Sequence, residues 1–181
     1  MFIIYILSKI DHHTLYFYTK NQMEMKLLTL LRNNEDVKFK NYILLNNYDL
    51  TDSNCYIFRC TCILNKLKLA QWLFNINDKI DVHTHGYEAL RYACGDLKNL
   101  EMAKWLHLCN NNVDFSYNKS ECIRYAFYNQ QLNIIEWIFT KGGTIEDLKD
   151  EYFHVGKMYS FAHSHNWTEG LKFLENHLPK K

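Results

Sequence analysis

The sequence predicts a predominantly all-α protein built from stacked helix–turn–helix repeats. Three arginines recur with spacings of 32 (91−59) and 33 (124−91) residues, at Arg59, Arg91 and Arg124. Three tryptophans recur with spacings of 33 (105−72) and 32 (137−105) residues, at Trp72, Trp105 and Trp137. A fixed period of about 20–50 residues is the signature of a repeat architecture, in which each unit cannot bury its apolar face alone.

Each repeat also begins and packs in a regular way. An aspartate followed by an apolar residue stands ten residues before each arginine, at Asp49, Asp81 and Asp114. In the second unit, residues 87–94 predict a first helix, residues 95–96 a turn and residues 100–108 a second helix with apolar residues at helical spacing. The small residues Ala93 and Ala126, two positions after the arginines, would let neighbouring helices approach closely.

The two ends of the chain depart from this pattern. Residues 1–24 predict an N-terminal cap segment, a candidate β-hairpin in which residues 2–7 and 14–19 are rich in β-branched and aromatic residues. Residues 25–181 predict the repeat array of about four to five helix pairs, including a degraded first and a divergent last unit. In the last unit, Asn166 with Glu169 three residues later predicts a capped helix running to His177.

Composition excludes several classes of protein. Apolar residues make up 48% of the chain and charged residues 23%, which is typical of a soluble globular protein. The formal net charge is only +1 and basic residues do not cluster, so neither a nucleic acid nor a membrane is the expected partner. Six cysteines lack the spacing of a disulfide framework and no secretory signal precedes them, which indicates an intracellular protein with reduced thiols.

No motif points to a metal, a cofactor or catalysis. The closest candidate ligand pairs are Cys60 with Cys62 and His83 with His85, and each pair is separated by one residue rather than by the two to five that zinc sites use. A phosphate-binding glycine loop, a nucleophile elbow and the H-E-x-x-H motif are all missing from the sequence. We therefore expect no metal, no cofactor and no enzymatic activity.

The recurring arginines and tryptophans each allow two interpretations. A row of three guanidinium groups could bind an acidic or phosphorylated peptide, because arginine suits bidentate contacts with carboxylate and phosphate. The favoured alternative is that each arginine donates hydrogen bonds to neighbouring backbone, since regularity along a stack is what packing between adjacent repeats requires. For the tryptophans, packing in the core is favoured over an aromatic cage for a ligand.

The repeat resembles a known family. The strings LRYAC at residues 90–94, LEMAKWL at residues 100–106 and VDF at residues 113–115 are similar to the ankyrin repeat, whose length is about 33 residues. They look most like the divergent ankyrin-repeat proteins of large DNA viruses, although the family's T-P-L-H motif is absent. The resemblance implies an ankyrin-like solenoid that acts as a protein–protein interaction module, without catalysis, on a host or viral protein.

The repeat frame also predicts where a partner binds. The segments between each aspartate and the next arginine differ in almost every residue, as a comparison of residues 83–88 with residues 116–121 shows. Such variation is expected of exposed segments that connect one repeat to the next, here called fingers. The predicted partner-binding residues come from these segments and their edges: His83, His85, Tyr87, Phe115, Tyr117 and Lys119. We expect a monomer with one protein partner; the alternative is a small structural or assembly subunit of a virus particle.

Overall fold

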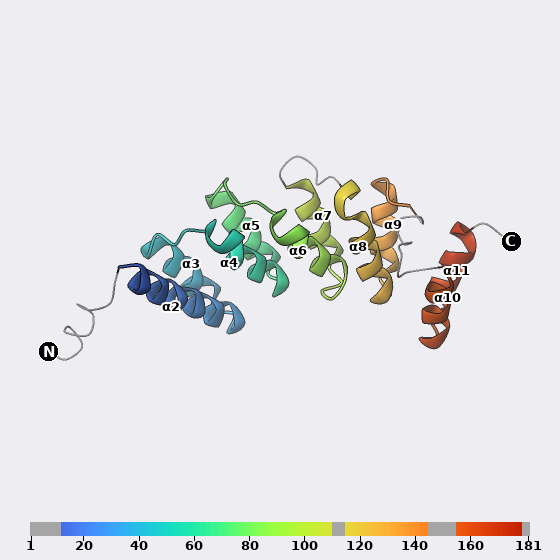
Figure 1. Cartoon of the computed structure of the whole chain (residues 1–181), viewed down its shortest axis with the longest axis horizontal. Coiled ribbons are helices and arrows are strands. Elements are labelled where there is room, and N and C mark those ends of the chain that lie inside the picture. Colours follow the sequence, from blue (N-terminus) through green and yellow to red (C-terminus); the bar gives the residue numbers. More distant parts are fainter. Residues whose placement is uncertain (1–11, 110–114, 145–154, 179–181) are drawn as a thin grey trace.

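The computed structural model describes residues 12–109, 115–144 and 155–178. Within these residues the chain forms ten helices and no strand, which confirms the predominantly all-α class. Figure 1 shows the helices following one another in pairs along the long axis of the molecule. The pairs are α2 (His12–Arg32) with α3 (Asp36–Leu45), α4 (Asp52–Ile63) with α5 (Leu67–Ile76), α6 (Thr84–Cys94) with α7 (Leu100–Leu108), α8 (Phe115–Tyr128) with α9 (Leu132–Thr140), and α10 (Val155–Ser164) with α11 (Thr168–His177).

A left-handed residue turns the chain between the two helices of every pair. These residues have φ between 52° and 59°, and they are Asn34, Asn65, Lys98, Gln130 and Asn166. In four of the pairs, the backbone N–H of the residue after this left-handed residue donates to the carbonyl oxygen of the residue five positions earlier. The N–H of Lys66, for example, donates to the carbonyl oxygen of Thr61 at 3.1 Å. This is the bond that closes a Schellman turn and satisfies a carbonyl at the end of the first helix. In the α6–α7 turn the corresponding bond joins Asn99 to Ala93, six positions back, so this turn is one residue longer.

The first helices of successive pairs pack against one another. Helix α4 lies against α2 and α6, and α6 lies against α8, so that their buried faces merge into one core. Ala93 and Ala126 have no exposed surface at these contacts, as the sequence predicts. Burial at this density is what allows short helices to persist, since isolated helices of 9 to 14 residues are marginal in water.

Aromatic rings join the last pair to the one before it. The ring of Phe127 in α8 lies 4.9 Å from the ring of Trp167 and 5.9 Å from that of Phe161. On the second helices, Phe139 lies 5.5 Å from Phe173. These contacts are worth about 0.5–1.5 kcal/mol per pair beyond the area they bury. The divergent last unit is therefore attached to the array through its aromatic residues.

Three expectations about the chain ends and connections need correction. Residues 14–19, predicted as a strand, lie within α2, and this helix runs unbroken across the predicted boundary at residue 24; residues 2–7 lie outside the described residues. Strand propensity depends on context, and here the following leucines, with Leu27 and Leu31 fully buried, hold the segment in a helix. Asn166 does not cap α11, because Trp167 occupies the N-cap and Asn166 is the left-handed turn residue. Third, residues 84–88 and 116–121, predicted as fingers, are helical and open α6 and α8.

The tryptophans pack to different extents. Trp137 is 8% exposed, while Trp72 and Trp105 are only partly buried against the core. Trp105 lies 5.9 Å from the ring of Phe74 in an edge-to-face arrangement. The ammonium of Lys40 lies 5.2 Å from the centre of the Trp72 ring, which is within the range of a cation–π interaction. Packing between repeats is thus the role that these contacts support.

Candidate functional site

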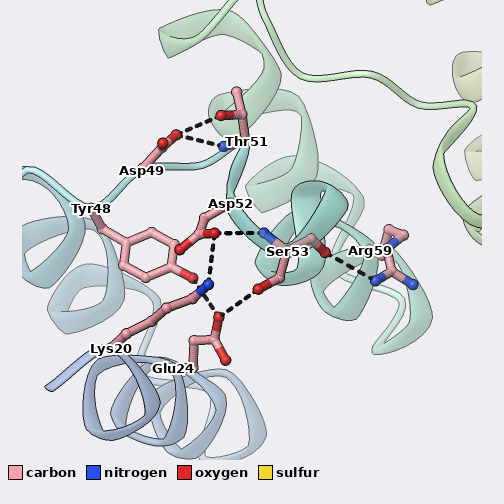
Figure 2. A network of polar contacts seen from close by, with 8 residues as sticks. All are labelled: Lys20, Glu24, Tyr48, Asp49, Thr51, Asp52, Ser53 and Arg59. Carbon is pink, nitrogen blue, oxygen red and sulfur yellow. Dashed lines mark hydrogen bonds and ion pairs between the residues drawn. The ribbon is translucent and has the colours of Figure 1, made fainter. Parts of the chain in front are cut away.

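Arg59 lies at the centre of a polar network where α4 begins. Its Nε donates to the carbonyl oxygen of Asn54 at 3.0 Å. One terminal nitrogen donates to the carbonyl oxygen of Ser53 at 3.4 Å (Figure 2). The other terminal nitrogen forms an ion pair with Glu88 of α6, the first helix of the next pair. Only 9% of the Arg59 side chain is exposed. The backbone-bonding interpretation is confirmed for this arginine, and the guanidinium is already occupied within the protein.

The backbone that Arg59 holds is unusual. Ser53, Asn54 and Cys55 have φ of 50°, 55° and 56°, so three consecutive residues are left-handed at the start of α4. Non-glycine residues in this region are strained by about 1–3 kcal/mol each and persist only where surrounding contacts fix them. Tyr87, which precedes Arg91 by four residues as Cys55 precedes Arg59, also has a positive φ, of 61°. The strain therefore recurs at the same place in the repeat.

A second set of contacts ties this turn to α2. The Lys20 ammonium lies 2.7 Å from the carboxylate of Asp52, which also accepts a hydrogen bond from the backbone N–H of Ser53. Glu24 accepts hydrogen bonds from the hydroxyls of Tyr48 and Ser53, each at 3.3 Å. Burial, followed by the Glu24 carboxylate, raises the pKa of the Tyr48 hydroxyl, which stays protonated at neutral pH. Figure 2 shows these groups turned toward one another between α2 and the start of α4. Together with the ion pair between Arg59 and Glu88, the network braces α2, α4 and α6.

The arginine–glutamate contact repeats one unit later. Arg91 in α6 lies 2.6 Å from the carboxylate of Glu121 in α8, as Arg59 in α4 pairs with Glu88 in α6. Each glutamate stands three residues before the next arginine of the series. Glutamate is also the residue that segments 83–88 and 116–121, predicted to be variable, have in common at the same position. Sequence reasoning missed this signal because the segments were compared for their differences. In the last pair the equivalent position is Lys157, so the sequence pattern changes there.

The recurring aspartates shape the backbone before the first helices. A carboxylate oxygen of Asp49 accepts hydrogen bonds from the N–H and the hydroxyl of Thr51, and this bonding lowers the pKa of Asp49. The Asp81 carboxylate accepts from the N–H of His83 at 2.8 Å in the same way. Such aspartate-closed turns satisfy backbone donors just ahead of a helix. Asp114 lies outside the described residues.

An exposed pair of aromatic residues distinguishes the surface of α8. Tyr125 and Tyr128, here called the α8 tyrosine pair, are 42% and 46% exposed. Tyr125 packs so closely on Gly95 that a Cβ added to the glycine would lie 2.9 Å from the Tyr125 Cβ. Tyr128 meets the ring of Phe161 edge-on at 5.1 Å. Both tyrosines are thus held by neighbouring first helices while their outer surfaces stay open to solvent.

The structure describes two of the predicted partner-binding side chains. His83 precedes α6, and its ring lies 4.7 Å from the ring of Tyr87 and 3.4 Å from the Asp81 carboxylate. The His83 side chain is 34% exposed, and Tyr87 is half-buried against the core. These two residues therefore lie together, and much of their surface is used within the protein.

The other four predicted partner-binding residues are placed only by their backbone. His85 lies in the first turn of α6, and Phe115, Tyr117 and Lys119 lie in the first turns of α8; their side chains are outside the described part of the structure. Their role in binding stays a prediction. Because they open helices rather than form fingers, a partner that contacts them would also reach the first helices.

The cysteines are free thiols that face the core. Five are buried and Cys60 is half-buried. Burial raises the pKa of Cys62 and raises that of Cys109 to about 11. No group of three or more potential metal ligands occurs among the described residues. We expect the purified, reduced protein to contain less than about 0.1 equivalent of zinc; stoichiometric zinc by elemental analysis would contradict this.

Thiol chemistry gives a second expected result. At pH 7.5 a thiol of pKa about 11 is ionised in fewer than about one molecule in a thousand, and only the thiolate attacks alkylating agents. Iodoacetamide should therefore modify the native protein slowly, with Cys60 first because it is the most accessible of the six. Peptide mass mapping after timed labelling measures the order, and urea-unfolded protein is the control in which all six react. Rapid native labelling of Cys62 or Cys94 would contradict this burial pattern.

The described helices include no membrane span, and no known relative of the chain is found. No helix among the described residues is long and apolar enough to cross a membrane. Comparison with models of protein families, with curated proteins and with solved structures finds no match. The surface that the stacked helices present is therefore the feature from which a function can be inferred.

Proposed function

We propose that this protein is a protein–protein interaction module, an ankyrin-like solenoid that contacts its partner through the first helices and the segments that lead into them. The observation that carries the proposal is the α8 tyrosine pair, two exposed rings held in place on a row of packed helices. Exposed tyrosines supply a rigid apolar face and a hydroxyl, and they are enriched among the residues that dominate binding energy.

The internal pairing of charges supports the same proposal. Arg59 and Arg91 are engaged with carboxylates of the next repeat, so they serve the scaffold and leave recognition to other residues. A scaffold braced in this way keeps its surface side chains in fixed positions, which lowers the entropy lost on binding. The predicted residues His83, His85, Tyr87, Phe115, Tyr117 and Lys119 would extend the contact along the starts of α6 and α8.

The resemblance to ankyrin-repeat proteins of large DNA viruses supplies the setting. By that resemblance the proposed module is viral, intracellular and without cofactor or catalytic activity, and it binds a host or viral protein. The repeat spacing and the strings at residues 90–94 and 100–106 support this part of the proposal.

The proposal is tested by capture from a lysate of host cells. The variant Tyr125→Ala with Tyr128→Ala should weaken capture of the partner at least about tenfold, or 1.4 kcal/mol, measured by quantitative mass spectrometry. The variant Tyr125→Phe with Tyr128→Phe keeps the ring packing against Gly95 and Phe161 and should retain folding, which thermal melting checks. A matched change on the second helices, Lys68→Ala with Glu136→Ala, should leave capture unchanged; loss of capture there instead would place the partner on the other face.

The residues predicted from sequence are tested in the same assay. His85→Ala with Tyr117→Ala should also weaken capture at least about tenfold while melting stays nearly constant, since surface changes usually alter stability by about 0.5 kcal/mol or less. If this variant binds normally and the α8 tyrosine variant does not, the contact is centred on the C-terminal half of α8.

A second candidate function is an assembly subunit of a virus particle. It is favoured by apolar side chains on α3, the second helix of the first pair, where Val37, Leu44 and Leu45 are 73%, 58% and 82% exposed. Light scattering coupled to size-exclusion chromatography separates the two candidates. A monomer over a wide concentration range supports the binding module, and assembly that increases with concentration supports the subunit.

A further inference from the structure

A groove on the second helices lies apart from the α8 tyrosine pair. It is lined by residues at the C-terminal ends of α7 and α9: Lys104, His107, Leu108, Trp137, Thr140 and Lys141. Its volume of about 300 Å³ accommodates a few side chains. The groove therefore forms where one repeat meets the next, on helices that the arginine–glutamate contacts do not use.

The walls of this groove are apolar and aromatic. Leu108 is 66% exposed at the rim, and Trp137 and His107, both nearly buried, meet edge-to-face with ring centres 5.7 Å apart. Burial lowers the pKa of His107, and the nearby Lys141 ammonium lowers it further, so the imidazole is neutral at pH 7. The base of the groove consequently carries no charge of its own.

The charged residues among the described lining of the groove are both basic. Lys104 and Lys141 are both exposed, and none of the described residues that line the groove is a carboxylate. The neighbouring groove between α9 and α11 differs, because its lining includes both Glu136 and Lys172. A carboxylate that entered the α7–α9 groove would meet two ammonium groups in partly apolar surroundings, where charge-assisted contacts are stronger than in water.

The C-terminal ends of α7 and α9 limit how much the lysine charges alone can contribute to the binding of an anion in the groove. Both α7 and α9 end at the groove, and the carbonyl ends of helices carry partial negative charge that opposes an anion. An occupant must therefore also bury apolar surface against Leu108 and Trp137. This requirement selects a segment that carries acidic and aliphatic side chains side by side.

We propose that the α7–α9 groove is a second docking site, which binds an acidic segment of a protein partner with a leucine-sized side chain between carboxylates. The carboxylates pair with Lys104 and Lys141, and the aliphatic side chain packs between Leu108 and Trp137. This site goes beyond the proposed first-helix surface and is independent of it. A partner that engaged both surfaces would gain affinity through the raised effective concentration of the second contact.

The test uses the full chain and a defined peptide. The probe is N-acetylated Gly-Ser-Glu-Leu-Glu-Ser-Gly, titrated into ¹⁵N-labelled protein and followed by amide chemical shifts. We expect shifts concentrated in residues 104–108 and 137–141, with a dissociation constant of about 1 mM, as suits a single short contact. Peptides with Gln-Leu-Gln or Glu-Ala-Glu at the centre should bind at least about fivefold more weakly, because each removes one of the two contributions.

Protein variants supply the matched controls. Lys104→Glu with Lys141→Glu should abolish the shifts, whereas Lys26→Glu with Lys68→Glu, an equal charge change on exposed lysines elsewhere, should leave binding within about twofold. Leu108→Ser, at an exposed site, keeps the fold and should weaken binding at least about threefold. Tyr125→Ala with Tyr128→Ala should leave peptide binding intact, so failure of the first-helix proposal and failure of this one are distinguishable.

Three outcomes would overturn the proposal. One is the absence of shifts in the groove with peptide at about ten times the expected dissociation constant. Another is equal loss of binding in both charge-reversal variants, which would mean attraction to the whole protein rather than to the groove. The third is binding of a ten-nucleotide oligothymidine at the groove without binding of the peptide, which would assign the lysines to phosphate.

Discussion

Replacing Arg59 with methionine should destabilise the protein by about 3–5 kcal/mol, the range found when one partner of a buried ion pair is removed. The guanidinium holds the left-handed turn at Ser53 and Asn54 and pairs with Glu88 of the next repeat. Methionine keeps much of the side-chain volume but none of the donors, so the loss reports on hydrogen bonds and charge. Urea unfolding followed by circular dichroism measures the change in the free energy of unfolding.

The equivalent change one repeat later is the matched control. Arg91 pairs with Glu121 at 2.6 Å, and 25% of its side chain is exposed, compared with 9% for Arg59. Water screens the more exposed pair, so Arg91→Met should cost distinctly less than Arg59→Met. A double-mutant cycle of Arg59→Met with Glu88→Gln should give a coupling of about 0.5–3 kcal/mol. Equal losses at the two arginines, or no coupling, would mean that the Arg59 brace is not the source of the stability.

The repeat and its turns were predictable from sequence because their causes are local. Asparagine tolerates left-handed backbone, and Asn65 lies at a left-handed turn position. The predicted turn at Gly95 and Asp96 lies at the start of a longer connection, which turns at Lys98. The buried small residues Ala93 and Ala126 follow the arginines at a fixed offset, which periodicity alone reveals.

Features that depend on two distant segments were not predictable in this way. The pairing of Arg59 with Glu88 joins residues 29 positions apart, and only the packing of α4 on α6 brings them together. The strained backbone at Ser53 to Cys55 has no signal in residue type, since serine and cysteine rarely adopt left-handed conformations. The helical state of residues 14–19 likewise follows from tertiary packing that overrides strand propensity.

Binding surfaces were harder still to predict, because exposure is a property of the assembled array. Tyr125 and Tyr128 share α8 with Cys122 and Ala126, which are fully buried, and the sequence marks no difference between these neighbours beyond helical spacing. The α7–α9 groove is lined by Lys104 and Lys141, which the sequence places in different repeats. Only the register of one second helix on the next sets their side chains around a common space.

Replacing Trp137 with alanine should also have a large effect, about 3–5 kcal/mol, as truncation of buried aromatic side chains does. Trp137 is 8% exposed and packs edge-to-face with His107 across the α7–α9 contact. Trp72→Ala and Trp105→Ala should cost less, because both rings are only partly buried and less apolar surface returns to water when they are removed. Their equivalent repeat positions alone would instead predict equal losses for the three variants.

The order of the three tryptophan variants decides between local packing and repeat position. Chemical unfolding of each variant gives the free energies, and Trp137→Phe, which retains an aromatic ring beside His107, should recover a large part of the loss. A Trp137→Ala loss below about 1 kcal/mol would mean that this ring is a surface feature and that the α6–α7 and α8–α9 pairs are joined by other contacts. Phe127→Ala tests the separate junction with the last pair, because the Phe127 side chain is fully buried and its ring meets that of Trp167 at 4.9 Å.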